Sequence, residues 1–228
     1  MVVFGLWYPQ PYRFLLEITG IYLIILVVDV VCGPLLTLIL ASPKKSTRER
    51  TLDFSLIGCI QIIALAYGMF SVWQARPVAL VFEVDRLVVV TANEVQVDQL
   101  PQAPTGLQHL PLWGVLQAGT RSAQNPQELL SSIELGMAGI SPAMRPDWWQ
   151  NWDSSLSAMR SRARPLSDLM AQRPTETSKL EEAAQASSLD VQALHYLPLV
   201  SSKNLEWVAL LNADMQMVGW APVDGFTQ

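Results

Sequence analysis

The sequence has few of the residues that most often build catalytic and metal sites. Its 228 residues include only two cysteines, Cys32 and Cys59, and two histidines, His109 and His195. Both cysteines lie inside long apolar runs, where cysteine usually packs as a small apolar residue. The rest of the chain therefore offers no thiol nucleophile, no disulfide framework and no cysteine-based zinc site.

The two histidines do not make up for this shortage. Neither belongs to an HExxH arrangement, and no GxSxG, phosphate-binding loop or GxGxxG fingerprint stands between a strand and a helix. A histidine beside leucine, as in LQHLPL or ALHYLPL, is more often packed or solvent-exposed than a ligand. We therefore expect no catalytic residues, no cofactor and no metal, and we predict that the protein is not an enzyme.

Charge is scarce in two long stretches. Residues 18–40 carry one ionisable side chain, Asp29, and residues 54–73 carry none. About 20 apolar residues in a helix cross a hydrocarbon core of about 30 Å, so we predict two transmembrane helices. The alternative is a buried hairpin in a soluble protein, which is rare for two runs of this length.

The loop between the two apolar runs, residues 41–53, is basic. Short loops rich in lysine and arginine stay on the cytoplasmic side of a membrane. The sequence therefore predicts a hairpin whose two ends emerge on the opposite side. The basic residues of the loop are Lys44, Lys45, Arg48 and Arg50.

Residues 74–228 are predicted to form an exported domain. From residue 77 onward, nine basic and sixteen acidic side chains give it a negative charge, which argues against nucleic acid as a partner. Alternation of apolar and polar residues predicts strands, and capping patterns predict helices that start near Asn125 and Asp153. A further polar and largely exposed helix is expected over residues 175–187. We expect an α+β domain with an antiparallel sheet packed with helices. The predicted strands cover residues 79–84, 87–92, 198–200, 206–211 and 216–221.

The first 17 residues are too short to span a membrane, and they lack the charged start of a signal peptide. The aromatic pair Trp7 and Tyr8 followed by Pro9 suits the membrane surface. This segment fits either the outer end of a helix that begins upstream or a short apolar N-terminus.

Asp29 needs an explanation, because a carboxylate near the middle of a bilayer is costly unless it is neutral, paired or turned toward protein. By depth, Gln61 and Tyr67 on the return helix are within reach as hydrogen-bond donors. Gly33 and Pro34 favour a kink and a close helix approach. Asp29 either locks the two helices together or faces a third helix, which is either one that begins upstream or that of a partner.

Three tryptophans, Trp148, Trp149 and Trp152, lie close together between prolines and acidic residues. Such a group is usually part of a core or a lid over it. The alternative is that the rings anchor a partner, because tryptophan is enriched at interfaces.

Several segments taken in order resemble the type IV pilin accessory proteins of the TfpX/TfpZ type. These segments are WYP, VDVVCGPLLTL, SPKK, QIIALAYG, ARPVALVFEVDR and the closing APVDGF. Members of that family usually begin with a further membrane helix before the WYP, and this sequence starts at the last few residues of such a helix. The resemblance implies a multi-pass protein of the bacterial inner membrane with its C-terminal domain in the periplasm.

The resemblance also implies a function and a partner. We expect a chaperone-like accessory factor that holds a type IV major pilin during pilus assembly or stabilises the pilus. It would contact the pilin's membrane helix through Asp29, Gly33 and Pro34 and meet the periplasmic head with its exported domain. The alternative is a membrane-anchored periplasmic enzyme or ligand sensor.

Overall fold

The computed structural model describes residues 5, 7–20, 23, 27, 31, 35 and 47–226. The chain divides into two compact units. One unit comprises residues 17–76. The other, here called the α+β domain, joins the described part of residues 1–16 to the segment that begins at Pro77.

Helix α3 (Thr47–Gln74) is the main described element of the first unit. At 1.5 Å per residue its 28 residues extend about 42 Å, more than the thickness of a hydrocarbon core. The helix begins earlier than the predicted residue 54, because residues 47–53 of the expected loop are helical. At its C-terminal end the Arg76 guanidinium lies 3.6 Å from the ring centre of Trp73 and donates to the Trp73 carbonyl, a favourable place for a cation.

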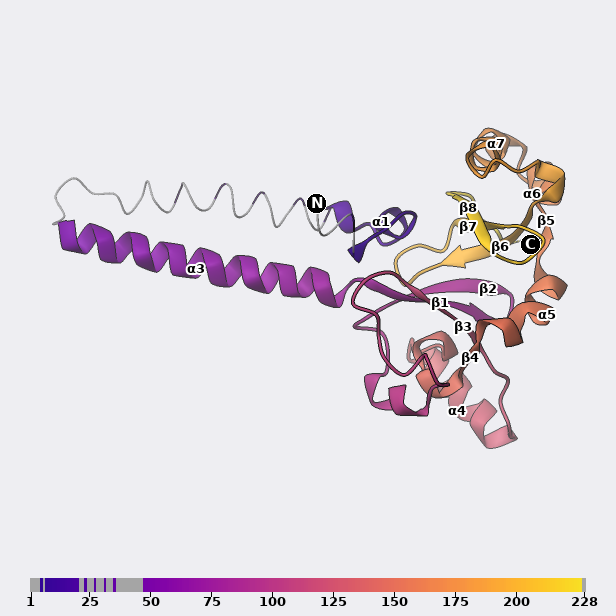
Figure 1. Ribbon diagram of the computed structural model, residues 1–228, viewed down its shortest axis with the longest axis horizontal. Helices are drawn as coiled ribbons and strands as arrows, with labels where there is room; N and C mark the ends of the chain where they lie inside the picture. The colour runs from indigo at the N-terminus through magenta and orange to yellow at the C-terminus, as the bar shows by residue number, and fades with distance from the viewer. Residues whose placement is uncertain are drawn as a thin grey trace. The chain divides into compact units, whose positions relative to one another are not determined.

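The α+β domain is built on a mixed sheet in the order β4-β3-β1-β2-β6-β7-β8, with β5 paired to β6 (Figure 1). The predicted α+β class and four of the five strands agree closely with the structure, and the fifth, at residues 198–200, begins earlier. Strands from both ends of the domain share this sheet, since β2 pairs with β6. The strands are β1 (Pro77–Glu83), β2 (Arg86–Thr91), β3 (Leu116–Thr120), β4 (Trp149–Asn151), β5 (Arg164–Pro165), β6 (His195–Val200), β7 (Trp207–Leu211) and β8 (Met217–Ala221).

The expectation of a purely antiparallel sheet was wrong. β1 runs parallel to β3, with Phe82 opposite Gly119, and β2 runs parallel to β6, with Leu87 opposite Leu199. The tight connections, such as that between β1 and β2, give antiparallel pairs. Long stretches of chain separate β1 from β3 and β2 from β6. Such connections let the chain return to the end of the sheet at which the earlier strand starts, as a parallel pair requires.

Two apolar cores lie on this sheet. One packs β1 to β4 against the irregular segment near Leu107, and the other packs β6 to β8 against α6 and α7. Helices α6 and α7 gather beside β6 to β8, and α4 lies at the other end of the sheet (Figure 1). The helices are α4 (Pro126–Met137), α5 (Trp152–Arg162), α6 (Leu166–Gln172) and α7 (Thr177–Ala186), with short 3-10 turns η2 (Val97–Gln102), η3 (Pro142–Met144), η4 (Pro146–Trp148), η5 (Pro174–Glu176) and η6 (Val191–Ala193).

Two helices differ from their predictions. Helix α7 was expected to be exposed, yet it buries Leu180, Ala183 and Ala184 over the sheet. Helix α5 begins one residue before Asp153, which therefore lies in the first turn rather than at the N-cap. In α7 the apolar residues that dock the helix are too few to stand out from its polar surface.

A segment near the N-terminus packs into the α+β domain. Helix α1 (Tyr12–Leu15) is one turn long, and Tyr8, Tyr12 and Leu15 are buried. Burial raises the pKa of Tyr12 to about 12. The Ser201 hydroxyl donates to the Leu15 carbonyl at 3.2 Å, and it accepts bonds from the amides that follow in its own turn. This hydrogen bond joins residues that are 186 positions apart.

We predict that Ser201→Ala destabilises the α+β domain by about 1–2 kcal/mol, because the buried Leu15 carbonyl then loses its partner. The free energy of unfolding of the full chain in detergent, followed by tryptophan fluorescence, measures this loss. Ser202→Ala is the matched control, since Ser202 is exposed and its removal should change stability by less than about 0.5 kcal/mol. Equal values for the two variants would contradict the role given to Ser201.

Candidate partner-binding surfaces

Asp29, Gly33 and Pro34, the predicted contacts within the first apolar run, lie outside the described residues. Gln61 and Tyr67 lie on α3, where Gln61 is half-buried and Tyr67 is 73% exposed. Six residues apart, they point about 120° away from one another around the helix axis. A single narrow helix contact therefore does not include both side chains.

Helix α3 is long and apolar enough to cross a membrane, and within the described residues it is the one helix with that character. It has only 11% of its most apolar window buried. Its charged side chains, Arg48, Glu49, Arg50 and Asp53, all lie in its first two turns. Beyond those turns the apolar side chains lie all round the helix, which suits contact with lipid or with another apolar helix.

The three tryptophans form part of the core. Trp148, Trp149 and Trp152 are 4, 3 and 8% exposed. The indole nitrogen of Trp149 donates to the Ala143 carbonyl at 2.8 Å, which fixes the ring inside the β1 to β4 core. Such burial is what the core alternative expects, and the anchoring of a partner by these rings stays a prediction.

Trp148 nevertheless lies close to the start of helix α4, which is exposed. The guanidinium carbons of Arg121 and Arg145 lie 4.9 and 5.2 Å from its ring centre, close enough for cation–π attraction. Arg121 forms a 2.6 Å ion pair with Glu128 in the first turn of α4. This pair, stacked on a buried ring, fastens the start of α4 to the domain.

The N-terminal cap adds to this attachment. The Asn125 side chain accepts a hydrogen bond from the Glu128 amide, which agrees with the predicted helix start near Asn125, and Pro126 occupies the first helical position. The Glu128 carboxylate reaches back to the Gln124 amide. At the other end, Gly139 has a φ of +86°, which suits the turn after a helix.

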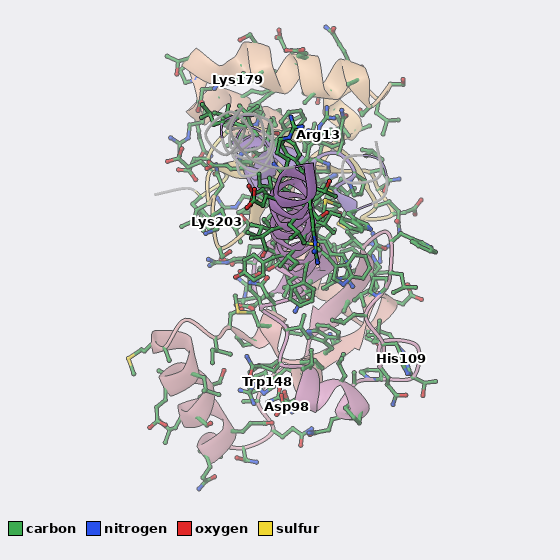
Figure 2. The ribbon with its side chains drawn as sticks, turned by 90° about the vertical axis from the view of Figure 1, so that its left-hand side faces the viewer. Arg13, Asp98, His109, Trp148, Lys179 and Lys203 are labelled. Carbon is green, nitrogen blue, oxygen red and sulfur yellow. The ribbon has the colours of Figure 1, made fainter. Side chains whose placement is uncertain are left out.

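One side of α4 is apolar and faces solvent. At 100° per residue its exposed apolar side chains fall within an arc of about 100°, whereas the half-buried Glu128, Ser132 and Leu135 share the opposite side. In Figure 2 the side chains of α4 project from the edge of the domain, near the labelled Trp148. The α4 apolar face consists of Leu129, Leu130, Ile133 and Met137, which are 51, 61, 53 and 79% exposed.

The sequence predicted this helix but not the exposure of the α4 apolar face. An amphipathic pattern says that one side is apolar, and it does not say whether core or partner covers that side. The feature that decides which side of α4 faces the domain is the ion pair between Arg121 and Glu128, which residue order alone does not reveal. The ion pair with Arg121 turns the Glu128 side of α4 toward the domain, which leaves the apolar side outward.

The described residues contain no cluster of three or more histidine, cysteine or acidic side chains that suits a metal. His109 is exposed at the tip of a loop, where Figure 2 shows it at the edge of the domain. His195 opens β6 and is half-buried.

Two known proteins match almost the whole chain. The serogroup I and serogroup E1 fimbrial assembly proteins of Dichelobacter nodosus are each 34% identical over 226 residues, which covers 99% of this chain and 88% of each relative. The chain belongs to the family of fimbrial assembly proteins. The protein for serogroups C1 and C2 of that organism is 44% identical over 102 residues, 45% of this chain and 78% of the relative. No family model matches the chain, and no solved structure matches it.

We predict that the attachment of α4 weakens in acid. The hydrogen bond from Arg121, followed by that from the Gln124 amide, lowers the pKa of Glu128 to about 2. A lowered carboxyl pKa favours the folded state above the ordinary value of about 4.5, and this contribution is lost as the pH falls toward 2. An NMR titration of the Glu128 side-chain carboxyl in the full chain should place its midpoint near 2.

The pH dependence of unfolding provides the second readout. Glu128→Gln should remove part of the stability loss between pH 5 and 2. Glu134→Gln neutralises a carboxylate of the same helix that has no arginine partner among the described residues, and it should leave that loss in place. A Glu128 midpoint near 4.5 would show that the ion pair does not form in solution.

Proposed function

We propose that this protein is an inner-membrane accessory factor for a type IV pilin and acts as a chaperone-like, non-catalytic partner in pilus assembly. The observation that carries the proposal is the relationship to proteins named for fimbrial assembly across 99% of the chain. The motifs shared with type IV pilin accessory proteins of the TfpX/TfpZ type supply the narrower assignment. An apolar helix and a separate α+β domain suit such a role, because pilins combine a membrane helix with a periplasmic head.

The packing of the N-terminal segment supports the hairpin. Residues 8–16 and 77–226 belong to one folded unit, joined by the bond from Ser201 to Leu15, so they share one side of the membrane. The chain between them must then cross an even number of times. If α3 spans the bilayer, residues 18–40 supply the second crossing. The basic loop supports a turn in the cytoplasm, and with it a domain in the periplasm.

We assign the membrane part of the pilin contact to the hairpin. Asp29, Gly33 and Pro34 would meet the pilin's apolar helix. On α3, Gln61 and Tyr67 face different directions, so one of them contacts the pilin helix while the other faces lipid or the first helix of the hairpin.

We assign the contact with the pilin head to the α4 apolar face. An exposed contiguous apolar patch on a soluble domain commonly marks an interaction site. Helix α4 carries Glu128 and Glu134 but neither lysine nor arginine, whereas helices that lie on anionic membranes are rich in both. The α4 apolar face therefore suits a protein surface better than a lipid surface. Within the proposed function, that protein is the periplasmic head of the pilin.

Substitution on this face tests the assignment. Ile133→Glu combined with Leu130→Glu should weaken binding of the cognate pilin to the full protein by at least about tenfold, as expected for loss of a central apolar contact. Neither residue is buried, so the melting temperature should change little. Leu205→Glu, at an exposed leucine in the loop before β7, is the control and should bind normally.

Deletion of the gene tests the function as a whole. In a strain that carries the cognate pilin, the deletion should abolish surface pili. The wild-type protein should restore them, and the α4 double variant should not. Replacing the pilin with that of a related strain should show whether the requirement follows the pilin. Normal piliation in the deletion strain would overturn the proposed function, whereas normal rescue by the double variant would overturn only the role of α4.

A further inference from the structure

A groove of about 390 Å³ lies between helix α7 and strand β8. The two elements are neighbours in Figure 1, at the opposite end of the domain from α4. On the helix side the lining residues are spaced three or four positions apart, which places them along one side of α7. They are Lys179, Glu182, Ala183 and Ala186. Strand β8 and Pro222 line the other side.

Strand β8 is at the edge of the sheet. It pairs with β7 on one side, and no described strand lies on its other side. In an antiparallel pair, alternate residues direct their N–H and C=O groups away from the neighbouring strand. No described residue outside β7 forms a hydrogen bond with the backbone of residues 217–221. The outer edge of β8 therefore carries backbone donors and acceptors that the described chain does not satisfy.

This edge is irregular only at its ends. A register shift interrupts the pairing next to Met217, and Pro222 follows the strand. A charge or a proline within an edge strand commonly prevents pairing with other chains. Residues 218–221, VGWA, contain neither. The outer edge of β8 can therefore pair with a short strand.

Helix α7 forms a fixed wall beside this edge. Its apolar side docks it on the sheet. A Cβ on Gly219 would lie 3.3 Å from the Ala183 carbonyl oxygen, so glycine lets the helix backbone come close to the strand. The Lys179 ammonium donates to the Pro222 carbonyl at 3.4 Å, which ties the helix to the end of β8. The groove is therefore a preformed part of the fold.

The charges of the groove favour a basic partner. The Lys179 ammonium is paired with the Glu176 carboxylate at 3.1 Å. Glu182 is exposed, and its carboxylate forms no ion pair with any described residue. The groove thus presents one unpaired negative charge, which suits a lysine or arginine side chain of the partner.

We infer that this groove binds an extended segment of another protein, which adds a strand to β8 and places a basic side chain near Glu182. Another strand backbone matches the alternating donors and acceptors along the edge. The described residues after β8 do not cover the edge, because they turn toward β6, where Gly225 packs against Pro198. The inference does not depend on the proposed function.

The test uses the full chain in detergent with ¹⁵N-labelled tryptophan, and Trp220→Phe identifies the Trp220 signals. The peptide N-acetyl-Thr-Val-Lys-Val-Thr-amide should shift these signals saturably. The same peptide with every backbone nitrogen methylated cannot donate hydrogen bonds to the edge and should not bind. Replacing its lysine with glutamate should weaken binding about two- to fivefold, the size expected for an exposed ion pair.

Variants connect the binding to the groove. Ala186→Phe fills the groove from an exposed position and should weaken the lysine peptide by at least about tenfold, as expected for a blocked central contact. Gln185→Phe changes the exposed neighbour that does not line the groove, and it should bind as the wild type does. Both variants should keep the wild-type melting temperature, because neither residue is buried.

A charge reversal tests the role of Glu182. Glu182→Lys should reverse the preference, so that the glutamate peptide binds more tightly than the lysine peptide. Glu181→Lys, at an exposed residue outside the groove, should keep the wild-type preference.

Four outcomes would overturn the inference. They are no saturable shift with the lysine peptide, equal binding of the methylated peptide, equal loss of binding in Gln185→Phe, and an unchanged preference in Glu182→Lys. A dimer of the full chain that Ala186→Phe dissociates would identify a second copy as the occupant, which would also overturn it.

Discussion

The docking of residues 8–16 against the α+β domain constrains where the chain can leave that domain and return to it. Tyr8, Tyr12 and Leu15 are buried there, and the Ser201 hydroxyl holds the Leu15 carbonyl. The two chain segments that flank residues 17–76 thus meet in one folded body. Any membrane-crossing segment between them leaves that body and must return to it. The packing of the two flanking segments therefore restricts the membrane topology of the chain between them.

The mixed sheet carries two separate apolar cores, one over β1 to β4 and one over β6 to β8. Close approaches hold its outer parts in place: a Cβ at Gly119 would collide with the Ser155 side chain, and Gly225 lets the chain near the C-terminus lie against β6. The outward side of α4 follows from an ion pair over Trp148.

Much of the fold was predictable where local pattern decides it. The valine-rich hairpin of β1 and β2 and the capped start of α4 stood out from residue order alone. Strand β3 did not, because LQAGT has a glycine, an alanine and a single β-branched residue, and it forms a strand through its neighbours β1 and β4. The burial of the three tryptophans matched one of two alternatives that residue type leaves open. The outward direction of the α4 apolar face was beyond prediction, because residue order does not show what covers an amphipathic helix.

The bond between Leu15 and Ser201 also has a consequence for the order in which the molecule is made. Leu15 leaves the ribosome long before β6, β7 and β8 exist, yet its docking site includes the turn that follows β6. Contacts of such sequence separation form late and slowly. The early segment must therefore wait, undocked, until nearly all of the chain has been synthesised, and completion of the domain requires both of its ends to lie on the same side of any membrane.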